Sequence, residues 1–135
     1  MDTLNVVSKL GEINKIRAFL KKNLAAFSIS EKDFYIIELS LLEICINIIR
    51  YAYPHGKGEI RLKTWHDTKS FFLEIRDDGI PFDPREIQDP NLENMLSSGK
   101  KGGFGIFLAK KLMDGFNYKR ENNQNVLTIH KVIAA

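Results

Sequence analysis

Alternating apolar and polar positions mark residues 71–76 as a β-strand. This period-2 spacing is typical of a strand in a sheet with at least one buried face. The same alternation places Asp77 on the apolar side, and a buried carboxylate is costly unless it has a partner. Gly79 and Pro81 follow at once, which predicts a sharp turn with open space beside the acid. A polar turn that only closes a strand would show the same residues, so this stretch alone leaves both interpretations open.

Helical spacing of apolar residues predicts three helices. The first covers residues 13–24, and the last covers residues 106–113. The long middle helix covers residues 31–53, and Ser30 with Asp33 three positions later resembles a helix-capping arrangement. The middle helix is hydrophobic nearly all round, which predicts that it is largely buried. Its polar stripe therefore needs partners, and this stripe consists of Ser40, Glu43, Asn47 and Arg50.

The remaining patterns predict four further strands and one long loop. Residues 3–9 form an expected edge strand, and residues 59–66 pair in a hairpin with the strand described above. Residues 116–120 and 126–132 form two closing strands joined by a tight turn. Residues 84–101 have weak periodicity and many Pro, Asn, Ser and Gly residues, so we expect a mobile loop with at most one helical turn. A loop of this length inside a compact domain is usually functional.

The composition limits the class of protein further. The 135 residues are enough for one domain, and 44% hydrophobic with 27% charged residues is typical of a globular chain. The net charge of +3 is mild and the basic residues are scattered, which disfavours nucleic acid as a partner. A single cysteine, Cys45, excludes a disulfide within the monomer, and the three histidines lack zinc-ligand spacing. No signal peptide or bilayer-spanning run is present, so we expect a cytoplasmic protein without membrane contact.

Three features stand in order along the chain and together indicate nucleotide chemistry. Glu43 and Asn47 lie one turn apart on the long helix, Asp77 and Gly79 end the strand, and residues 102–105 lead into the last helix. Glycines at a helix N-terminus let backbone N–H groups approach phosphate oxygens. An Asn amide oxygen suits Mg²⁺, an Asp carboxylate can accept the exocyclic amine of adenine, and a Glu can orient or deprotonate an attacking hydroxyl. Each feature alone is more common as ordinary structure, but their conjunction favours a nucleotide site.

These motifs carry a family resemblance. The sequence resembles the GHKL ATP-binding superfamily, which has the Bergerat fold. Residues 43–47 (EICIN) resemble its N box, and residues 77–82 (DDGIPF) and 103–106 (GFGI) resemble its two glycine boxes. Within the superfamily the chain is most similar to the stand-alone anti-sigma-factor serine kinases, through its small size, its short lid, residues 50–53 (RYAY) and residues 125–129 (NVLTI).

The resemblance implies a single histidine-kinase-like ATPase domain over residues 1–135. Its expected fold class is α+β, a two-layer α/β sandwich with a mixed, mainly antiparallel sheet and helices on one face. It implies Mg-ATP between the long helix and the lid, with Asn47 on magnesium, Asp77 on adenine, and Glu43 as the base that activates a serine hydroxyl. The ATP-binding residues that it implies are Asn47, Arg50, Asp77, Gly79, Pro81, Lys101, Gly102, Gly103, Phe104, Gly105, Ile106 and Asn125.

The resemblance also implies protein partners. The expected function is that of an ATP-dependent serine kinase that phosphorylates a STAS-type anti-sigma-factor antagonist and sequesters a sigma factor, acting as a homodimer. Arg17 on the first helix matches a region that the family uses for partners. In two departures, Arg50 stands where this branch often has His, and Asn125 occupies the position nearest to the adenine-side Thr of the superfamily. An alternative interpretation is therefore a nucleotide-binding module of the same fold that binds a protein partner without phosphoryl transfer.

Overall fold

The computed structural model describes residues 1–86 and 104–133. Its strands are β1 (Asp2–Val7), β2 (Glu59–His66), β3 (Ser70–Asp77), β4 (Gly115–Glu121) and β5 (Gln124–Val132). Its helices are α1 (Ile13–Leu24), α2 (Glu31–Asn47) and α4 (Phe104–Leu112), with the short turns η1 (Leu10–Glu12), η2 (Ile48–Ala52) and η3 (Pro84–Glu86). Each strand and helix predicted within the described ranges is present, although the long helix ends earlier than predicted. Most of the loop predicted at 84–101 lies outside the described ranges.

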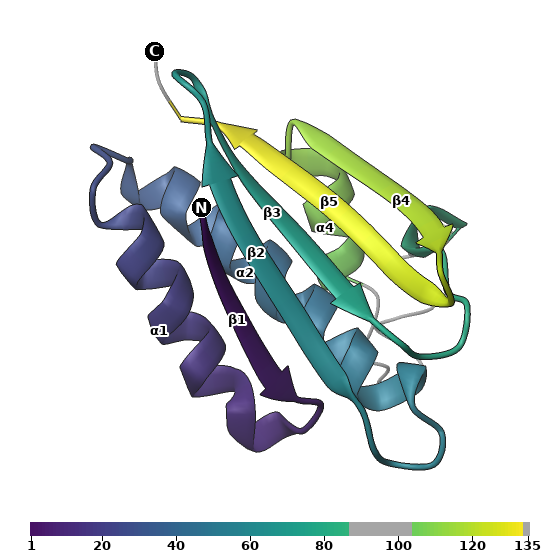
Figure 1. Cartoon of the computed structure of the whole chain (residues 1–135). Helices are drawn as coiled ribbons and strands as arrows, with labels where there is room; N and C mark the ends of the chain where they lie inside the picture. Colours follow the sequence, from purple (N-terminus) through teal and green to yellow (C-terminus); the bar gives the residue numbers. More distant parts are fainter. Residues whose placement is uncertain (87–103, 134–135) are drawn as a thin grey trace, which may run out of the picture.

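The strands form one open sheet that is covered on one face. The strand order is β1-β2-β3-β5-β4, and every neighbouring pair in it is antiparallel. Figure 1 shows α1, α2 and α4 on the same side of the sheet, while the other side carries none of the described helices. The predicted two-layer α+β architecture is confirmed. The sheet is antiparallel in all its described pairings, where the resemblance implied some parallel pairing as well.

The hydrophobic core lies between the sheet and these helices. Ile37 and Leu41 of α2 share one buried cluster with Leu73 and Ile75 of β3, and each is at most 1% exposed. Full burial of such a side chain contributes about 1.5–3 kcal/mol, so this cluster fixes α2 against the middle of the sheet. The alternation predicted for β3 is confirmed, and it brings Asp77 onto the covered face.

The start of α2 matches the sequence pattern. Ser30 is the N-cap residue, and its Oγ accepts a hydrogen bond from the Asp33 backbone N–H at 3.0 Å. A cap of this kind stabilises a helix by about 0.5–2 kcal/mol. The predicted capping arrangement is therefore confirmed, and it fixes the residue at which α2 begins.

The end of α2 differs from its hydrophobic pattern. The α-helix stops at Asn47, and Ile48–Ala52 form the π-helical turn η2, where the sequence predicted one α-helix to residue 53. A π turn is wider than an α turn, so it rotates every later side chain, and such turns are frequent at functional sites. Within this turn Arg50 is exposed, while Ala52 is buried. The Ala52 carbonyl accepts a hydrogen bond from the Ile80 N–H at 2.9 Å, so a contact distant in sequence holds this turn.

A two-residue turn sets the register of the last hairpin. Asn122 and Asn123 have φ angles of 51° and 61°, and Asn is one of the few residues that adopt this left-handed conformation readily. The register places Arg120 opposite Asn125, which in turn lies opposite Asp77 on β3. The predicted turn is confirmed, and it aligns residues from three strands in one row across the sheet.

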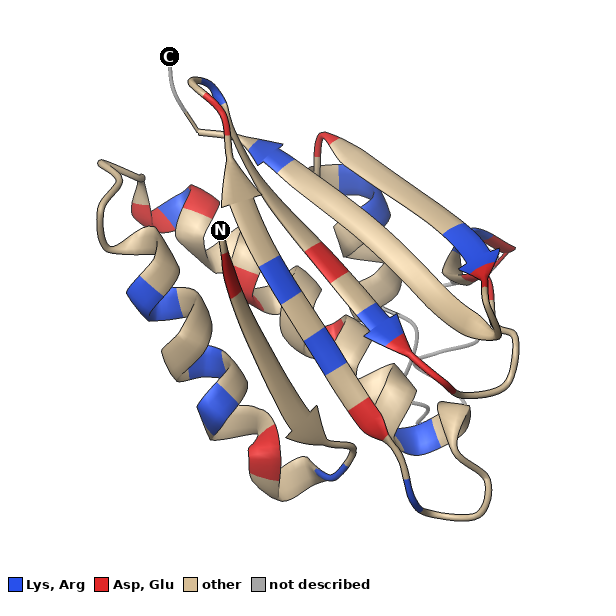
Figure 2. Ribbon diagram, in the orientation of Figure 1, with Lys and Arg blue, Asp and Glu red and all other residues tan. Residues whose placement is uncertain are grey.

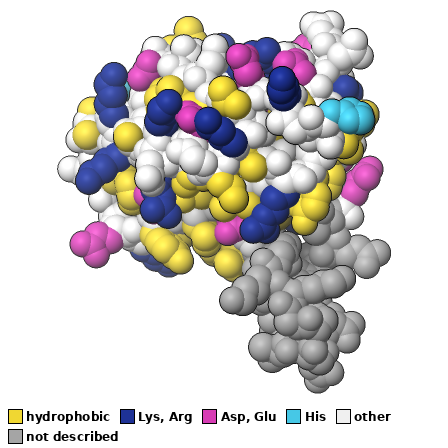
Figure 3. Space-filling view, turned by 90° about the horizontal axis from the view of Figure 1, so that it is seen from below, with side chains coloured by type: hydrophobic (Ala, Val, Ile, Leu, Met, Phe, Trp, Pro, Cys, Tyr) yellow, Lys and Arg dark blue, Asp and Glu magenta, His cyan; other side chains and the backbone are white. Residues whose placement is uncertain are grey.

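Charged side chains are spread over the fold. Figure 2 shows Lys and Arg along α1 and on the middle of β2, and the face drawn in Figure 3 intersperses Lys and Arg with hydrophobic side chains. Arg17 is exposed on α1, and its predicted partner contact stays a prediction. Within residues 1–86 and 104–133, no helix is long and apolar enough to cross a membrane.

Candidate functional site

Asp77 is a buried acid whose two oxygens have different surroundings. It ends β3 with 3% of its surface exposed, and its Oδ1 accepts hydrogen bonds from the Gly79 N–H and from Asn125 Nδ2, both at 2.9 Å. No donor among the described residues reaches Oδ2, which keeps some contact with solvent. Burial raises the pKa of Asp77, and the hydrogen bonds from Asn125 and Gly79 oppose that effect. One oxygen is therefore used by the fold, and the other is available to a ligand.

A cavity opens beside this acid, between the end of α2 with η2 and the sheet. The empty space there is about 440 Å³, a volume that includes open solvent at its mouth. The lining residues with polar side-chain groups are Asn47, Tyr51, Asp77, Tyr118 and Asn125. The walls are otherwise apolar, with Ile44, Ile48, Ile75, Ile106 and Leu127 among them. An apolar cavity with a few placed polar groups is typical of a small-molecule site.

Gly79 allows the chain after β3 to approach η2. A Cβ at this position would overlap the backbone carbonyl of Ala52, the group that also accepts the hydrogen bond from the Ile80 N–H. A larger residue would push the turn outward and carry Asp77 with it. The close approach predicted for Gly79 is confirmed in this form, while its contact with a purine ring stays a prediction.

Asn125 lies next to Asp77 in the cavity wall and joins three segments. Its Nδ2 donates to Asp77 Oδ1 and to the Ile80 carbonyl at 2.8 Å, and its Oδ1 accepts from the Phe82 N–H at 3.2 Å and the Tyr118 hydroxyl at 2.5 Å. The sequence singled out Asn125 only through its position near the family's Thr. Its pairing with Asp77 follows from the register of β5 with β3, in which Asn125 lies opposite Asp77.

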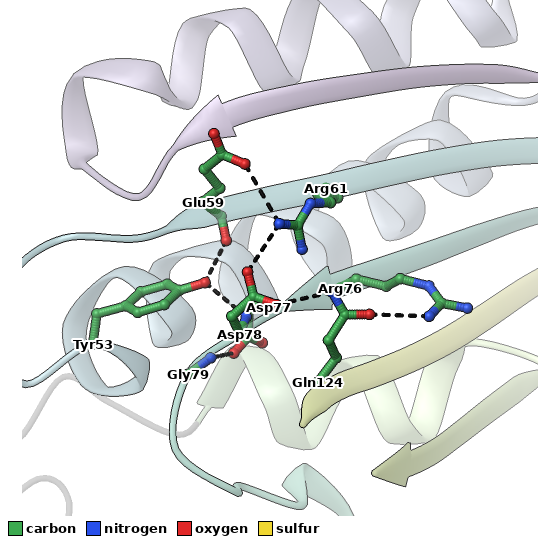
Figure 4. A network of polar contacts seen from close by, with 8 residues as sticks. All are labelled: Tyr53, Glu59, Arg61, Arg76, Asp77, Asp78, Gly79 and Gln124. Carbon is green, nitrogen blue, oxygen red and sulfur yellow. Dashed lines mark hydrogen bonds and ion pairs between the residues drawn. The ribbon is translucent and has the colours of Figure 1, made fainter. Parts of the chain in front are cut away.

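A polar network on the uncovered face of the sheet holds Asp78, the next residue along the chain (Figure 4). Asp78 accepts hydrogen bonds from Arg61 at 2.9 Å and from Gln124 at 2.8 Å. The Tyr53 hydroxyl accepts from the Asp78 backbone N–H at 2.8 Å and donates to the Glu59 carbonyl at 2.5 Å. The hydrogen bonds from Arg61 and Gln124 lower the pKa of Asp78, so this carboxyl stays charged while it anchors the turn. Sequence reasoning missed this network, because its members come from three strands and the end of η2.

Glu43 and Asn47 lie one turn apart but have different surroundings. Asn47 lines the cavity together with Asp77, whereas Glu43 does not. Glu43 is half-buried against α4, where a Cβ on Gly105 would overlap its side chain. Gly105 is therefore what lets the first turn of α4 pack against Glu43. The roles assigned to Glu43 as base and to Asn47 as magnesium ligand stay predictions.

The other predicted ATP-binding residues lie in several places. Ile106 is 1% exposed and lines the cavity, while Arg50 and Pro81 are exposed and do not line it. Phe104 begins α4, and Lys101, Gly102 and Gly103 lie outside the described residues. Their contacts with ATP stay predictions.

Comparison with known families identifies the chain. The model of the histidine kinase-like ATPase domain matches residues 6–131, which is most of the sequence. The chain therefore belongs to the histidine kinase-like ATPase domain family, and the GHKL assignment made from three motifs is confirmed. A search of curated protein sequences finds no significant match.

Solved structures share the fold at low sequence identity. The crystal structure of the RsbU and RsbW domains of Rv1364c from Mycobacterium tuberculosis aligns over 98% of this chain with 13% identity and a TM-score of 0.64. This chain spans 33% of that structure's chain, about a third of its length. The catalytic domain of histidine kinase ThkA aligns over 99% of both chains, with 16% identity and a TM-score of 0.54. At these identities the similarity shows the fold alone.

Proposed function

We propose that this chain binds ATP, phosphorylates a serine of a STAS-type anti-sigma-factor antagonist, and sequesters a sigma factor. The observation that carries the proposal is Asp77, a buried acid with one oxygen held by its own turn and the other beside an apolar cavity. An apolar cavity with one free acceptor fits a flat ring that carries an exocyclic amine, as adenine does. Membership of an ATPase family, and fold similarity to a structure with an RsbW domain, support the same function.

The phosphates and the metal are assigned to the part of the cavity that α2 and α4 line. Ile106, in the first turn of α4, lines the cavity, and a helix N-terminus favours anions. We therefore assign the phosphates to this turn together with residues 101–103. The Asn47 amide oxygen is the kind of hard ligand that Mg²⁺ prefers. A magnesium ion there would offset part of the negative charge of the phosphates.

Glu43 is assigned as the general base. It lies one turn before Asn47 and against Gly105 of α4, between the two segments assigned to metal and phosphates. In the transfer step the serine oxygen bonds to the γ-phosphorus, the bond from that phosphorus to ADP breaks, and the serine proton passes to the Glu43 carboxylate.

Phosphoryl transfer is tested with labelled ATP and candidate antagonist proteins. Glu43→Gln is expected to slow labelling of a serine by about 10²–10⁴-fold, the usual contribution of a general base, with little change in ATP affinity. Glu38→Gln is the matched control, because Glu38 is also a half-buried carboxylate of α2 but lies about two and a half helical turns before Asn47 instead of one. Equal labelling rates for Glu43→Gln and the wild type would rule out the proposed base.

A second candidate function is a nucleotide-binding module without phosphoryl transfer. Glu43 does not line the cavity, and Arg50, which replaces the His of the related kinases, is exposed. Both observations suit a domain that uses the nucleotide only to shape a protein-binding surface. ATP binding without serine labelling of any partner recovered from the host would favour this function.

The partner side of the proposal needs its own measurement. Pull-downs from the host with and without ATP are expected to recover a sigma factor and an antagonist, and sedimentation is expected to show a homodimer. Arg17→Ala should weaken partner capture several-fold because Arg17 is exposed on α1. Lys32→Ala, an exposed basic position on α2, is the control. Equal partner capture by both variants would show that Arg17 on α1 is not part of the partner-binding surface.

A further inference from the structure

The side-chain amide of Asn125 has one orientation that satisfies its neighbours. Its Oδ1 faces the Phe82 N–H at 3.2 Å, and its Nδ2 faces the Ile80 carbonyl oxygen at 2.8 Å. Because a backbone N–H only donates and a carbonyl oxygen only accepts, a flipped amide would lose both hydrogen bonds. The Tyr118 hydroxyl is a further donor to Oδ1, and Nδ2 is thereby directed at Asp77.

This orientation determines which oxygen of Asp77 can carry a proton. Oδ1 faces two N–H donors, from Asn125 and Gly79, so a proton on Oδ1 would point at a donor. Protonation must therefore occur on Oδ2, which no described residue binds. A charged carboxylate accepts a hydrogen bond at Oδ2, whereas a protonated one donates a hydrogen bond there. The charge of Asp77 thus decides whether the cavity binds a ligand that donates a hydrogen bond to Oδ2, as an amine does, or one that accepts a hydrogen bond from it, as a carbonyl does.

We infer that Asn125 is a positioning residue for base specificity: it keeps Asp77 Oδ2 an acceptor and makes the cavity select a 6-amino purine over a 6-oxo purine. Its amide uses both donors and both acceptor positions within the protein, so it acts through Asp77 instead of contacting the base. Tyr118 supports this role because its hydroxyl holds the amide oxygen. Asn125 has this role only if the chain binds a nucleotide as proposed above.

The surroundings of Asp77 give Asn125 this control. Burial raises the pKa of Asp77, and the Asn125 hydrogen bond is the largest effect that lowers it. The other ionisable groups that interact electrostatically with Asp77 are Asp78 after β3, Arg120 and Tyr118 on β4, Cys45 on α2 and Tyr53 after η2. Burial raises the pKa of Cys45 to about 12 and that of both tyrosines above the usual range, so these three groups stay neutral near neutral pH.

The test uses three Mg-bound triphosphates that differ only at position 6 of the purine: ATP with an amine, inosine triphosphate with a carbonyl, and purine riboside triphosphate with hydrogen. Titration calorimetry over a range of pH gives their Kd values for the full chain and for Asn125→Ala, Asn125→Thr and Tyr118→Phe. Asn117→Ala is the control, because Asn117 is exposed and alternates with Tyr118 on β4. NMR follows the carboxyl titration of Asp77 in the nucleotide-free chain.

Asn125→Ala is expected to lower the ratio of ATP affinity to inosine triphosphate affinity by about tenfold, the size of one hydrogen bond to a charged group. It should also raise the Asp77 pKa. As the pH is lowered, ATP binding should therefore begin to weaken at a higher pH in this variant than in the wild type. Tyr118→Phe should shift the affinity ratio and the Asp77 pKa in the same directions, but by less. Asn125→Thr should retain part of the selectivity through its hydroxyl donor. The control Asn117→Ala should change neither quantity.

Different results would disprove the role of Asn125 and the binding of ATP. An unchanged affinity ratio and an unchanged Asp77 titration in Asn125→Ala would overturn the role of Asn125 while leaving ATP binding intact. If that variant does not fold, the same outcome in Tyr118→Phe and Asn125→Thr overturns it. A wild-type chain that binds none of the three triphosphates overturns the proposed function and, with it, the role of Asn125.

Discussion

At the scale of single residues, the site depends on how Asp77 divides its two oxygens. Oδ1 closes the turn after β3 through Gly79 and Asn125, and Oδ2 remains beside the cavity. Keeping a buried carboxylate charged is costly, and the fold offsets that cost with two N–H donors to one oxygen instead of an ion pair to both. This arrangement leaves the second oxygen for a ligand.

Asp77→Asn is expected to abolish ATP binding without unfolding the protein. Asn at this position can keep its oxygen toward the Gly79 N–H and Asn125 Nδ2, which directs its NH₂ group into the cavity, where it opposes the amine of adenine. Thermal melts should show an increase in Tm with saturating ATP for the wild type and for the control Asp114→Asn, but not for Asp77→Asn. A clear ATP-dependent increase in the Tm of Asp77→Asn would show that the carboxylate is not needed to bind adenine.

Gly79→Ala is expected to damage both stability and binding. The added methyl group would overlap the Ala52 carbonyl, and relief of such overpacking costs about 1–3 kcal/mol. Urea unfolding measures the loss of stability, and calorimetry should show ATP affinity falling at least about tenfold as the turn moves away from η2. Gly11→Ala is the control, because a Cβ at Gly11 meets no atom within 4 Å. Equal stability of the two variants would contradict the close packing of the turn on η2.

At the scale of elements, the end of β3 is held from both faces of the sheet. On the covered face Asn125 of β5 binds Asp77, and on the uncovered face Arg61 of β2 and Gln124 of β5 bind Asp78. The strand therefore presents its last acid from a clamped position. Such preorganisation lowers the entropy that a ligand must remove on binding.

Tyr53→Phe tests how far this clamp reaches. The Tyr53 hydroxyl joins the Glu59 carbonyl to the Asp78 N–H, so its loss leaves two backbone groups without their partner. We expect a loss of about 1 kcal/mol in the free energy of unfolding and a severalfold weaker ATP affinity. Tyr35→Phe, at an exposed position on α2, should change neither quantity. ATP affinity equal to wild type in Tyr53→Phe would limit the clamp to a structural role.

The sequence predicted those elements whose patterns are local. The period of β3 placed Asp77 on the buried face, and Ser30 with Asp33 marked the start of α2. The π turn at Ile48–Ala52 was out of reach, because a helix that is apolar nearly all round carries little information about its phase, and a hydrogen bond from Ile80 holds the turn. Features that depend on contacts distant in sequence, including the roles of Asn125 and Asp78, needed the fold.

At the scale of the whole molecule, pH acts on the carboxyl groups in opposite directions. Hydrogen bonds lower the pKa of Asp67, Asp78, Asp83 and Asp114 below the ordinary value of 3.8, whereas burial raises that of Asp77. A carboxyl with a lowered pKa contributes stability above pH 3.8, which is lost as pH falls through its folded pKa. A carboxyl with a raised pKa does the reverse, because stability is lost as pH rises from its unfolded pKa to its folded pKa. Acid should therefore destabilise the domain, with Asp77 opposing the trend.

Two neighbouring substitutions separate these effects. Without nucleotide, Asp78→Asn should be less stable than the wild type at neutral pH, because it loses the charged partner of Arg61, and the difference should vanish in acid. Asp77→Asn should be at least as stable as the wild type at neutral pH, because it removes a buried charge, and should match it in acid. Urea unfolding across the acid range measures both curves. If the free energy of unfolding depended on pH in the same way in both variants, the two adjacent acids would not differ in their charge environment. The proposal that Asp77 binds the ligand while Asp78 anchors the turn would then be wrong.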